Sequence, residues 1–308
     1  TGLTGSLSTK AANMVQKYVI EHSRFGIPLL LSSECPHGHQ ALDGYLLPVN
    51  LAAGCSFDPE LFEEAAKVSG QQLKEMGIHL ALVSALDMLR DPRWGRSEEC
   101  FGEDPYLASR MAEAVVKASP VPVTVKMRRG WDKGSINVLD FTKRMEDHGA
   151  AMVTVHGRTR SMLYSGVADW DAITRVKQQL SIPVIANGDI VNGETAVKCL
   201  KRTGADGIMI GRASFGDPWV FSDAAAAVAE LPTPERPPLA ERVDVAVRQF
   251  ELAREDKGEH IACLEARKHF AWYLRGVAYS NYYKEQISAI QSMEDVYRIA
   301  DGIRRDLK

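Results

Sequence analysis

Short apolar runs alternate with amphipathic helical patterns along the first 220 residues, and this alternation most constrains the fold. The runs favour β-structure, whereas the segments between them space apolar residues three and four apart. Strands that alternate with helices predict a parallel sheet joined by crossover helices, and eight such units predict an α/β fold, the (βα)8 TIM barrel. The predicted strands are 5–7, 28–32, 46–49, 80–86, 121–127, 152–156, 183–187 and 207–210.

The predicted helices are clearer than the strands. Pro59 and Pro105 each follow an Asp and therefore suit the first turn of a helix. The proline-rich tract 231–238 cannot continue a helix and predicts a stiff linker, which separates a barrel over 1–230 from a small helical domain over 239–308 with three or four helices. The other predicted helices are 10–23, 59–76, 104–117, 138–148, 170–180 and 193–202.

Composition excludes several classes of protein. With 45% hydrophobic residues, a chain of 308 residues can bury one large core and a smaller one. A net charge of −3 gives no global basic field for nucleic acid, and the five cysteines lack a compact spacing, which predicts free thiols in a reducing compartment. Residues 1–4 lack the pattern of a secretory leader, and no apolar run approaches the ~20 residues of a membrane span, so we expect a cytoplasmic protein.

Four short motifs lie at the ends of consecutive predicted strands in the second half of the barrel. Active sites of such barrels lie at the carboxyl ends of the strands, and the last two loops often hold a phosphate group. Gly188 and Gly211 permit close backbone approach, and Arg212 offers a planar, charged fork to a phosphate. The motifs therefore predict a phosphate site; they are Pro122 to Arg128, His156 to Thr159, Asn187 to Ile190, and Gly211 with Arg212.

Together these motifs make residues 119–308 resemble the FMN-dependent tRNA-dihydrouridine synthases, and the resemblance continues through Arg267 to Tyr273. It implies FMN as cofactor, NADPH as reductant and tRNA as partner. Lys126 matches a lysine beside the flavin ring, where a cation stabilises the reduced ring, and His156 matches a histidine of the same pocket. The residues that match the cofactor-binding segments are Lys126, His156, Asn187, Gly188, Asp189, Gly211 and Arg212.

The catalytic acid of that family has no counterpart here. The family reduces a uracil double bond with hydride from FMN and a proton from a cysteine at the end of the fourth strand. Here that segment runs from Ala85 to Arg90 and contains no cysteine. Cys35 follows the second predicted strand, and Cys100 lies on the loop after the fourth, where it is either a replacement acid or a neutral loop thiol. No catalytic residue and no metal ligand is therefore assigned.

The first 118 residues carry motifs of a different family. The segments Glu34 to His39, Asp91 to Arg96 and Phe101 to Leu107 resemble the amino-terminal half-barrel of family 3 glycoside hydrolases, of the β-xylosidase or β-glucosidase type. The resemblance implies that Glu34 and Arg96 hydrogen-bond a sugar while Glu99 orients the arginine. Retaining glycosidases need two carboxyl groups about 5 Å apart, and the nucleophilic Asp of this family belongs to later strands that are missing here.

The helical domain offers weak support for RNA binding. Residues 241–308 contain 12 Lys and Arg against 12 Asp and Glu, so no excess of positive charge marks a phosphate-binding face. Trp272 and Tyr273 fit core anchors between barrel and bundle better than base-stacking platforms. A local basic and aromatic patch, or alternatively a solvated helix face, comprises Arg267, Lys268, Arg275, Lys284, Tyr282 and Tyr283.

The sequence thus predicts a hybrid barrel, of engineered or recombined origin, made of half-barrels 1–118 and 119–230. Halves of two eight-stranded barrels can close together when their strand tilt and stagger agree. The main hypothesis is FMN binding by the second half without native catalysis, and no oligomeric state follows from it. The alternatives are an active FMN- and NADPH-dependent oxidoreductase acting on uridine in tRNA, a sugar-binding barrel or residual β-glycosidase, and a scaffold without a ligand.

Overall fold

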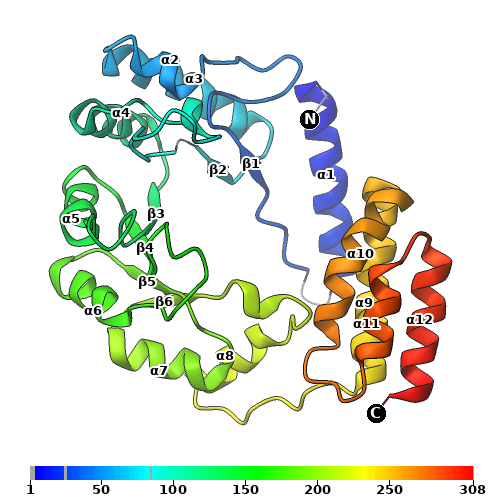
Figure 1. Cartoon of the computed structure of the whole chain (residues 1–308). Coiled ribbons are helices and arrows are strands. Elements are labelled where there is room, and N and C mark those ends of the chain that lie inside the picture. The colour runs from blue at the N-terminus through cyan, green and yellow to red at the C-terminus, as the bar shows by residue number, and fades with distance from the viewer. Residues whose placement is uncertain (1–3, 24–25, 84, 308) are drawn as a thin grey trace. The chain divides into compact units, whose positions relative to one another are not determined.

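The computed structural model describes residues 4–23, 26–83 and 85–307. The chain divides into two compact units, Thr1–Thr124 with Met145–Ala151 and Val125–Arg144 with Met152–Lys308. Within the described ranges there are twelve α-helices and six strands, and the strands form a two-stranded and a four-stranded sheet (Figure 1). The α/β class is confirmed. None of the described helices is long and apolar enough to cross a membrane.

The first unit is a small parallel sheet with helices. Strand β1 (Ser32–Glu34) pairs with β2 (Leu80–Leu82), with Glu34 opposite Leu82. Asp58 caps the helix that begins at Pro59, and Asp104 caps the helix that begins at Pro105, as predicted. The other elements are α1 (Gly5–His22), α2 (Asn50–Gly54), α3 (Pro59–Glu75), η1 (Ser97–Glu99) and α4 (Pro105–Ala118). Phe62 and Phe101 meet edge to face at the centre of its core.

Two predicted strands are wrong. Residues 5–7 form the first turn of α1, because the Thr4 hydroxyl accepts a hydrogen bond from the Leu7 amide and starts the helix there rather than at residue 10. Residues 46–49 form no strand, and Leu46 makes only an isolated bridge to Gly38. Ser84, inside the predicted strand 80–86, lies outside the described residues. In the described ranges the sheets therefore contain six strands instead of eight, and their hydrogen bonds do not close a barrel.

The second unit begins with a parallel sheet in the order β3-β4-β5-β6. His156 lies opposite Asn187, and Asn187 lies opposite Met209, so three consecutive strands end at one edge. The strands are β3 (Thr124–Arg128), β4 (Met152–His156), β5 (Val184–Asn187) and β6 (Gly207–Met209), and the helices between and after them are α5 (Val138–Asp147), α6 (Trp170–Gln179), α7 (Gly193–Thr203), η2 (Arg212–Ser214) and α8 (Val220–Val228). Fully buried Val153, Val155 and Val184 pack against Ile173 and Val176 beneath this edge.

Four helices complete the second unit, in the region where the sequence predicts three or four. Residues 231–238 contain no helix or strand, and α9 starts at Leu239. The bundle consists of α9 (Leu239–Lys257), α10 (Glu259–Tyr273), α11 (Asn281–Ser288) and α12 (Met293–Asp306) around Phe250, Phe270, Ile299 and Ile303 (Figure 1). Trp219 of the sheet-bearing segment packs against this core, and the bundle clusters with the β3–β6 sheet in one unit. The borders at 230 and 239 remain predictions.

Candidate functional site

The predicted site residues of the second half gather at the carboxyl edge of the β3–β6 sheet. His156 ends β4 and Asn187 ends β5, side by side in the parallel register. The Asn187 amide donates to the Met209 carbonyl at 2.7 Å and so holds β5 to β6. Its Nδ2 group is therefore used by the protein itself.

The two glycines of the site have different environments. Gly188 adopts φ +117°, and an added Cβ would lie 2.7 Å from the Ala168 Cβ and 2.9 Å from the His156 ring. This position thus requires glycine because the histidine ring packs on its backbone, a role that the sequence alone did not indicate. An added Cβ at Gly211 meets nothing within 4 Å, so the backbone there borders open space.

Asp189 bridges two arginines. Its carboxylate accepts hydrogen bonds from Arg158 at 2.7 and 2.9 Å and from the Ala168 amide at 2.7 Å, and Arg212 lies 3.9 Å away. Burial disfavours the charged form of Asp189, but the Ala168 amide, the Arg158 hydrogen bond and the nearby arginine charges outweigh it and lower the pKa. Asp189 thus ionises more readily than an ordinary aspartate and presents a negative charge to the two arginines.

Arg158 is a site residue that sequence reasoning missed. It is 2% exposed, donates to the carbonyls of Ser165 and Gly166 as well as to Asp189, and leaves its Nη1 buried without a hydrogen-bond partner in the described ranges. A buried charged donor without a partner is costly and points to a polar group still to be bound. The sequence signal that could have identified Arg158 is its position in the motif His156 to Thr159, two residues after His156.

An exposed aromatic ring supports the other arginines. The Arg212 guanidinium lies 4.3 Å from the centroid of the Tyr164 ring, and that of Arg128 lies 5.8 Å from it. Arg128 also donates to the carbonyls of Thr159 and Leu163 at 2.8 and 2.9 Å. Arg212 remains about half exposed and so can reach a ligand. Neither Arg128 nor Tyr164 was assigned a role from the sequence.

The surroundings of this edge lower the pKa of His156 and of Lys126. Burial is the first cause that lowers the pKa of His156, and the charges of Arg128, Lys126, Arg158 and Arg212 lower it further, to about 4, so the imidazole is neutral at pH 7. The surrounding protein and the charge of Arg128 also lower the pKa of Lys126. Four cations act on the His156 imidazole, and two of them, Arg158 and Arg212, flank the Asp189 carboxylate; together they create a positive potential that attracts a dianion.

The first unit brings the predicted sugar-binding residues into one neighbourhood. Glu34 is exposed at the end of β1. Arg96 forms a two-pronged pair with Glu99, with Nε to Oε1 at 2.7 Å and Nη2 to Oε2 at 2.5 Å. The Glu99 hydrogen bond raises the pKa of Arg96 against the effect of burial, and the charges of Asp87 and Glu34 raise it further. Three carboxylates therefore act on one exposed guanidinium.

The two candidate thiols are inaccessible. Cys100 is fully buried, with its Sγ 3.9 Å from the Arg96 carbonyl, and burial followed by the charges of Asp87 and Glu99 raises its pKa to about 11. Cys35 is 5% exposed, and burial likewise raises its pKa. Neither thiol can touch a substrate in this conformation. Within the described ranges, no group of three or more His, Cys, Asp or Glu side chains could hold a metal ion.

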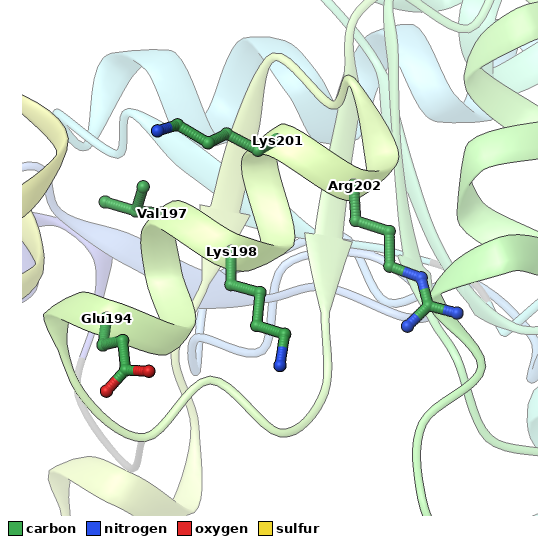
Figure 2. A pocket seen from close by; sticks show the side chains of 5 residues that line it. All are labelled: Glu194, Val197, Lys198, Lys201 and Arg202. Atoms are coloured by element: carbon green, nitrogen blue, oxygen red, sulfur yellow. The ribbon is translucent and has the colours of Figure 1, made fainter.

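A shallow depression on α7 is not the functional site. Figure 2 shows the side chains that line it, all from the outer surface of that one helix: Glu194, Val197, Lys198, Lys201 and Arg202. Arg202 is paired with Asp171 at 2.9 Å. No strand end contributes to the depression, so it is a solvated helix face.

In the helical domain, the residues of the predicted basic and aromatic patch have different environments. Tyr283 is buried and donates its hydroxyl to Asp306, and Arg267 donates to the Ile290 carbonyl at 2.7 Å. Tyr282 remains 66% exposed. Tyr273 is buried in the bundle core and Trp272 stacks on Phe215, which agrees with their predicted role as anchors.

Two family models match the chain, and they overlap. The dihydrouridine synthase model matches residues 100–305, and the model for the glycosyl hydrolase family 3 N terminal domain matches residues 3–159. Both resemblances stated from the motifs are confirmed.

The curated relatives that match this chain include several tRNA-dihydrouridine synthases. A probable tRNA-dihydrouridine synthase of Rickettsia conorii is 38% identical over 251 residues, covering 82% of this chain and 73% of the relative. The tRNA-dihydrouridine synthase B of Pasteurella multocida is 41% identical over 250 residues, covering 81% and 74%. A probable tRNA-dihydrouridine synthase of Rhizobium leguminosarum is 44% identical over 184 residues, covering 60% and 56%.

Solved structures with a similar fold are glycosidases. A beta-N-acetylhexosaminidase from Beutenbergia cavernae has a TM-score of 0.50 at 19% identity, covering 75% of this chain and 80% of that one. An exo-1,3/1,4-beta-glucanase from Pseudoalteromonas has a TM-score of 0.51 at 18% identity, covering 74% of this chain but only 33% of that one. At these identities the likeness concerns the fold alone.

Proposed function

This chain belongs to the dihydrouridine synthase family through residues 100–305, and we propose that it is an FMN-binding oxidoreductase of that type. Over residues 3–159 it also carries a glycosyl hydrolase family 3 N-terminal domain. FMN, when bound, supplies a two-electron carrier that NADPH reduces and that in turn reduces a uracil double bond. The observation that carries the proposal is the cationic cluster at the strand ends: Arg158 and Arg212 flank Asp189, and Lys126 acts with them on His156.

The cluster fits the phosphate of FMN. Arg212 offers a half-exposed guanidinium, Arg158 has an unpartnered buried Nη1, and the Gly211 backbone borders open space. A phosphate accepts such forked, charged donors strongly. Asp189 keeps both arginines oriented, because it hydrogen-bonds Arg158 and lies near Arg212.

Two further residues fit the flavin ring. Lys126 has no hydrogen-bond or ion-pair partner in the described ranges, so its ammonium group is available to stabilise negative charge. His156 is neutral, because its pKa is about 4, and therefore lines the pocket as a hydrogen-bonding group without adding charge. Asn187 braces β5 against β6 beneath them.

The finer architecture that we propose is a (βα)8 barrel of two halves, 1–118 and 119–230, with hybrid ancestry. The two family models support it, because they overlap only within 100–159, around the change of motif near Ser119. Both parent folds place their ligands at the carboxyl ends of the strands, which is the general rule for such barrels. Residues 231–238 and 239–308 then serve as linker and helical domain.

The proposed substrate is uridine in tRNA, as the names of the relatives suggest. The proton donor distinguishes this chain from the family pattern, because residues 85–90 contain no cysteine and Cys100 is buried. A positioned general acid contributes about 10²–10⁴-fold to a rate. We therefore expect flavin binding and reduction by NADPH, with uridine reduction slowed by a factor of that size.

The first experiment is a visible absorbance spectrum of the purified protein, as isolated and after incubation with FMN and desalting. A retained flavin band that NADPH bleaches supports the proposal, and dihydrouridine in tRNA then tests the substrate. A protein that stays colourless at high FMN concentration refutes it.

A second candidate function, sugar binding by the first unit, is favoured by the Arg96–Glu99 pair beside Glu34 and Asp87. Planar carboxylates and guanidinium groups suit vicinal hydroxyls. Adding xylose or glucose should shift the NMR signals of the Arg96 side chain, and Arg96→Ala should remove the saturable part of the shift. Absence of any saturable shift excludes this function.

A further inference from the structure

We propose that Trp272 of α10 is a positioning residue for the phosphate-binding turn that carries Arg212. The inference rests on the proposed function, since it concerns how the phosphate site is held in place. It assigns the helical domain a role in cofactor binding, in addition to any contact with a macromolecular substrate.

The main contact is an aromatic stack between the turn and the helix. The rings of Phe215 and Trp272 lie 4.4 Å apart between centroids and are inclined by only 9°. His269 meets both rings edge to face, at 6.1 and 4.8 Å. Lys268 places its ammonium group 5.5 Å from the Trp272 ring. Such stacked and edge-to-face arrangements stabilise aromatic contacts beyond their buried area.

The backbone is equally close at the next residue. Gly216 adopts φ +69°, and an added Cβ would lie 2.3 Å from the Trp272 carbonyl carbon and 2.5 Å from the Tyr273 nitrogen. Only glycine can therefore sit here, because the chain leaving the turn runs directly against the end of α10. The contact is thus formed by main chain as well as by rings.

The end of α10 is itself held rigidly. Buried Arg242 on α9 donates to the Tyr273 carbonyl, which is at the last residue of the helix. The Tyr273 hydroxyl donates to the Gln249 side chain at 2.8 Å, and Tyr273 is buried in the bundle core. Arg236, before α9, pairs with Asp217 just beyond the turn at 3.2 Å. The bundle therefore presents a fixed surface to the turn.

The turn transmits this constraint to Arg212. Phe215 donates its amide to the Arg212 carbonyl at 3.2 Å, and Ser214 donates to the Gly211 carbonyl at 3.0 Å, so Gly211 to Phe215 form one tight unit. Among the residues that the structure describes, the Arg212 side chain has only a weak pairing with Asp189 and its contact with Tyr164. Its place is therefore set by the turn, one end of which joins β6 and the other end of which rests on Trp272.

A comparison of two flavins tests this role, because riboflavin lacks the phosphate that Arg212 would bind. The dissociation constants of FMN and riboflavin are measured on the apoprotein by quenching of flavin fluorescence. For Trp272→Ala we expect FMN binding to weaken by roughly three- to tenfold, the scale of one aromatic pair, with riboflavin unchanged. Trp272→Phe should restore FMN affinity. Tyr282→Ala, an exposed aromatic residue of α11, is the matched control and should change neither constant.

A double-mutant cycle adds a second criterion. In an Arg212→Ala background, Trp272→Ala should have no further effect on FMN, because both changes remove the same interaction. If Trp272→Ala does not fold, as judged by thermal unfolding, Phe215→Leu breaks the same stack from the other side and should give the same selective loss. Equal losses for FMN and riboflavin, or no loss for either, overturn the inference. Failure of the wild-type chain to bind either flavin instead overturns the proposed function and this inference with it.

Discussion

Arg212→Ala is the sharpest perturbation of the proposed phosphate site. The residue lies in η2, immediately after Gly211, and its side chain is 47% exposed, whereas Arg158 of the same cluster is buried. It makes no hydrogen bond to Asp189 at 3.9 Å, so its removal leaves no buried partner without a donor. The substitution therefore reports on ligand contact rather than on folding.

The expected magnitude follows from burial and charge. A hydrogen bond to a charged group contributes about 1.5–3 kcal/mol, and the 47% exposure of the Arg212 side chain places the effect near the lower end because water screens it. We expect FMN affinity to fall by about 1.5–2 kcal/mol, or roughly ten- to thirtyfold. Arg212→Lys keeps the charge but loses the fork, and should recover only part of this loss.

The assay is a titration of the apoprotein with FMN, followed by flavin fluorescence at fixed ionic strength. Arg202→Ala is the matched control, because its side chain is 51% exposed and forms one ion pair, with Asp171, on the outer face of α7. The control should bind FMN like the wild type. Unchanged affinity in Arg212→Ala, or an equal loss with riboflavin, would refute the assignment of the phosphate to this turn.

Three other predictions concern the stability and chemistry of the chain. Gly188→Ala should lower the free energy of unfolding by about 2–4 kcal/mol in urea denaturation, because it adds backbone strain and a clash with His156. Gly211→Ala should lower it by less than about 1 kcal/mol, because an added Cβ meets nothing there. Equal losses for the two variants would contradict the packing argument. Asp295→Asn should lower the free energy of unfolding at pH 6, and this loss should shrink as the pH falls from about 4 to about 2. The reason is that the Gln291 amide and Arg298 lower the pKa of Asp295 in the folded state to about 2, and the carboxylate stabilises the fold only while it is ionised. A loss that stays constant with pH would exclude this cause. Cys100→Ser should leave NADPH oxidation and any dihydrouridine formation unchanged, because the thiol is fully buried, and loss of product in a folded variant would show that it reaches the substrate.

Local sequence patterns predicted most of the helices and the order of the elements. Asp58 before Pro59 and Asp104 before Pro105 mark helix starts that the structure places at those prolines. The parallel strands after residue 120 were also predicted within a few residues, because their apolar runs are long enough to bury. The first predicted strand was wrong. A short apolar run suggested a strand, but the Thr4 side chain caps a helix there by accepting a hydrogen bond from the Leu7 amide, three residues later.

The candidate site was predicted in part. The motifs identified Lys126, His156, Asp189 and Arg212, each of which the structure places at one sheet edge or in the turns beyond it. They did not identify Arg158. Its burial could not be predicted from local sequence, because it depends on the loop whose Gly166 carbonyl accepts a hydrogen bond from Arg158. They assigned Gly188 to ligand approach, which stays a prediction, and did not indicate that its backbone lies against the His156 ring and Ala168.

By itself the sequence determined the class of fold, the two family resemblances and the residue types available at the strand ends, because these depend on local periodicity and on short motifs. Only the tertiary structure decided which charges meet. Arg158 and Asp189 are 31 residues apart and pair because β4 and β5 end in register. Phe215 and Trp272 meet because the chain after η2 returns against the end of α10. Contacts of this kind depend on strand register and helix packing across distant segments, which no local pattern encodes.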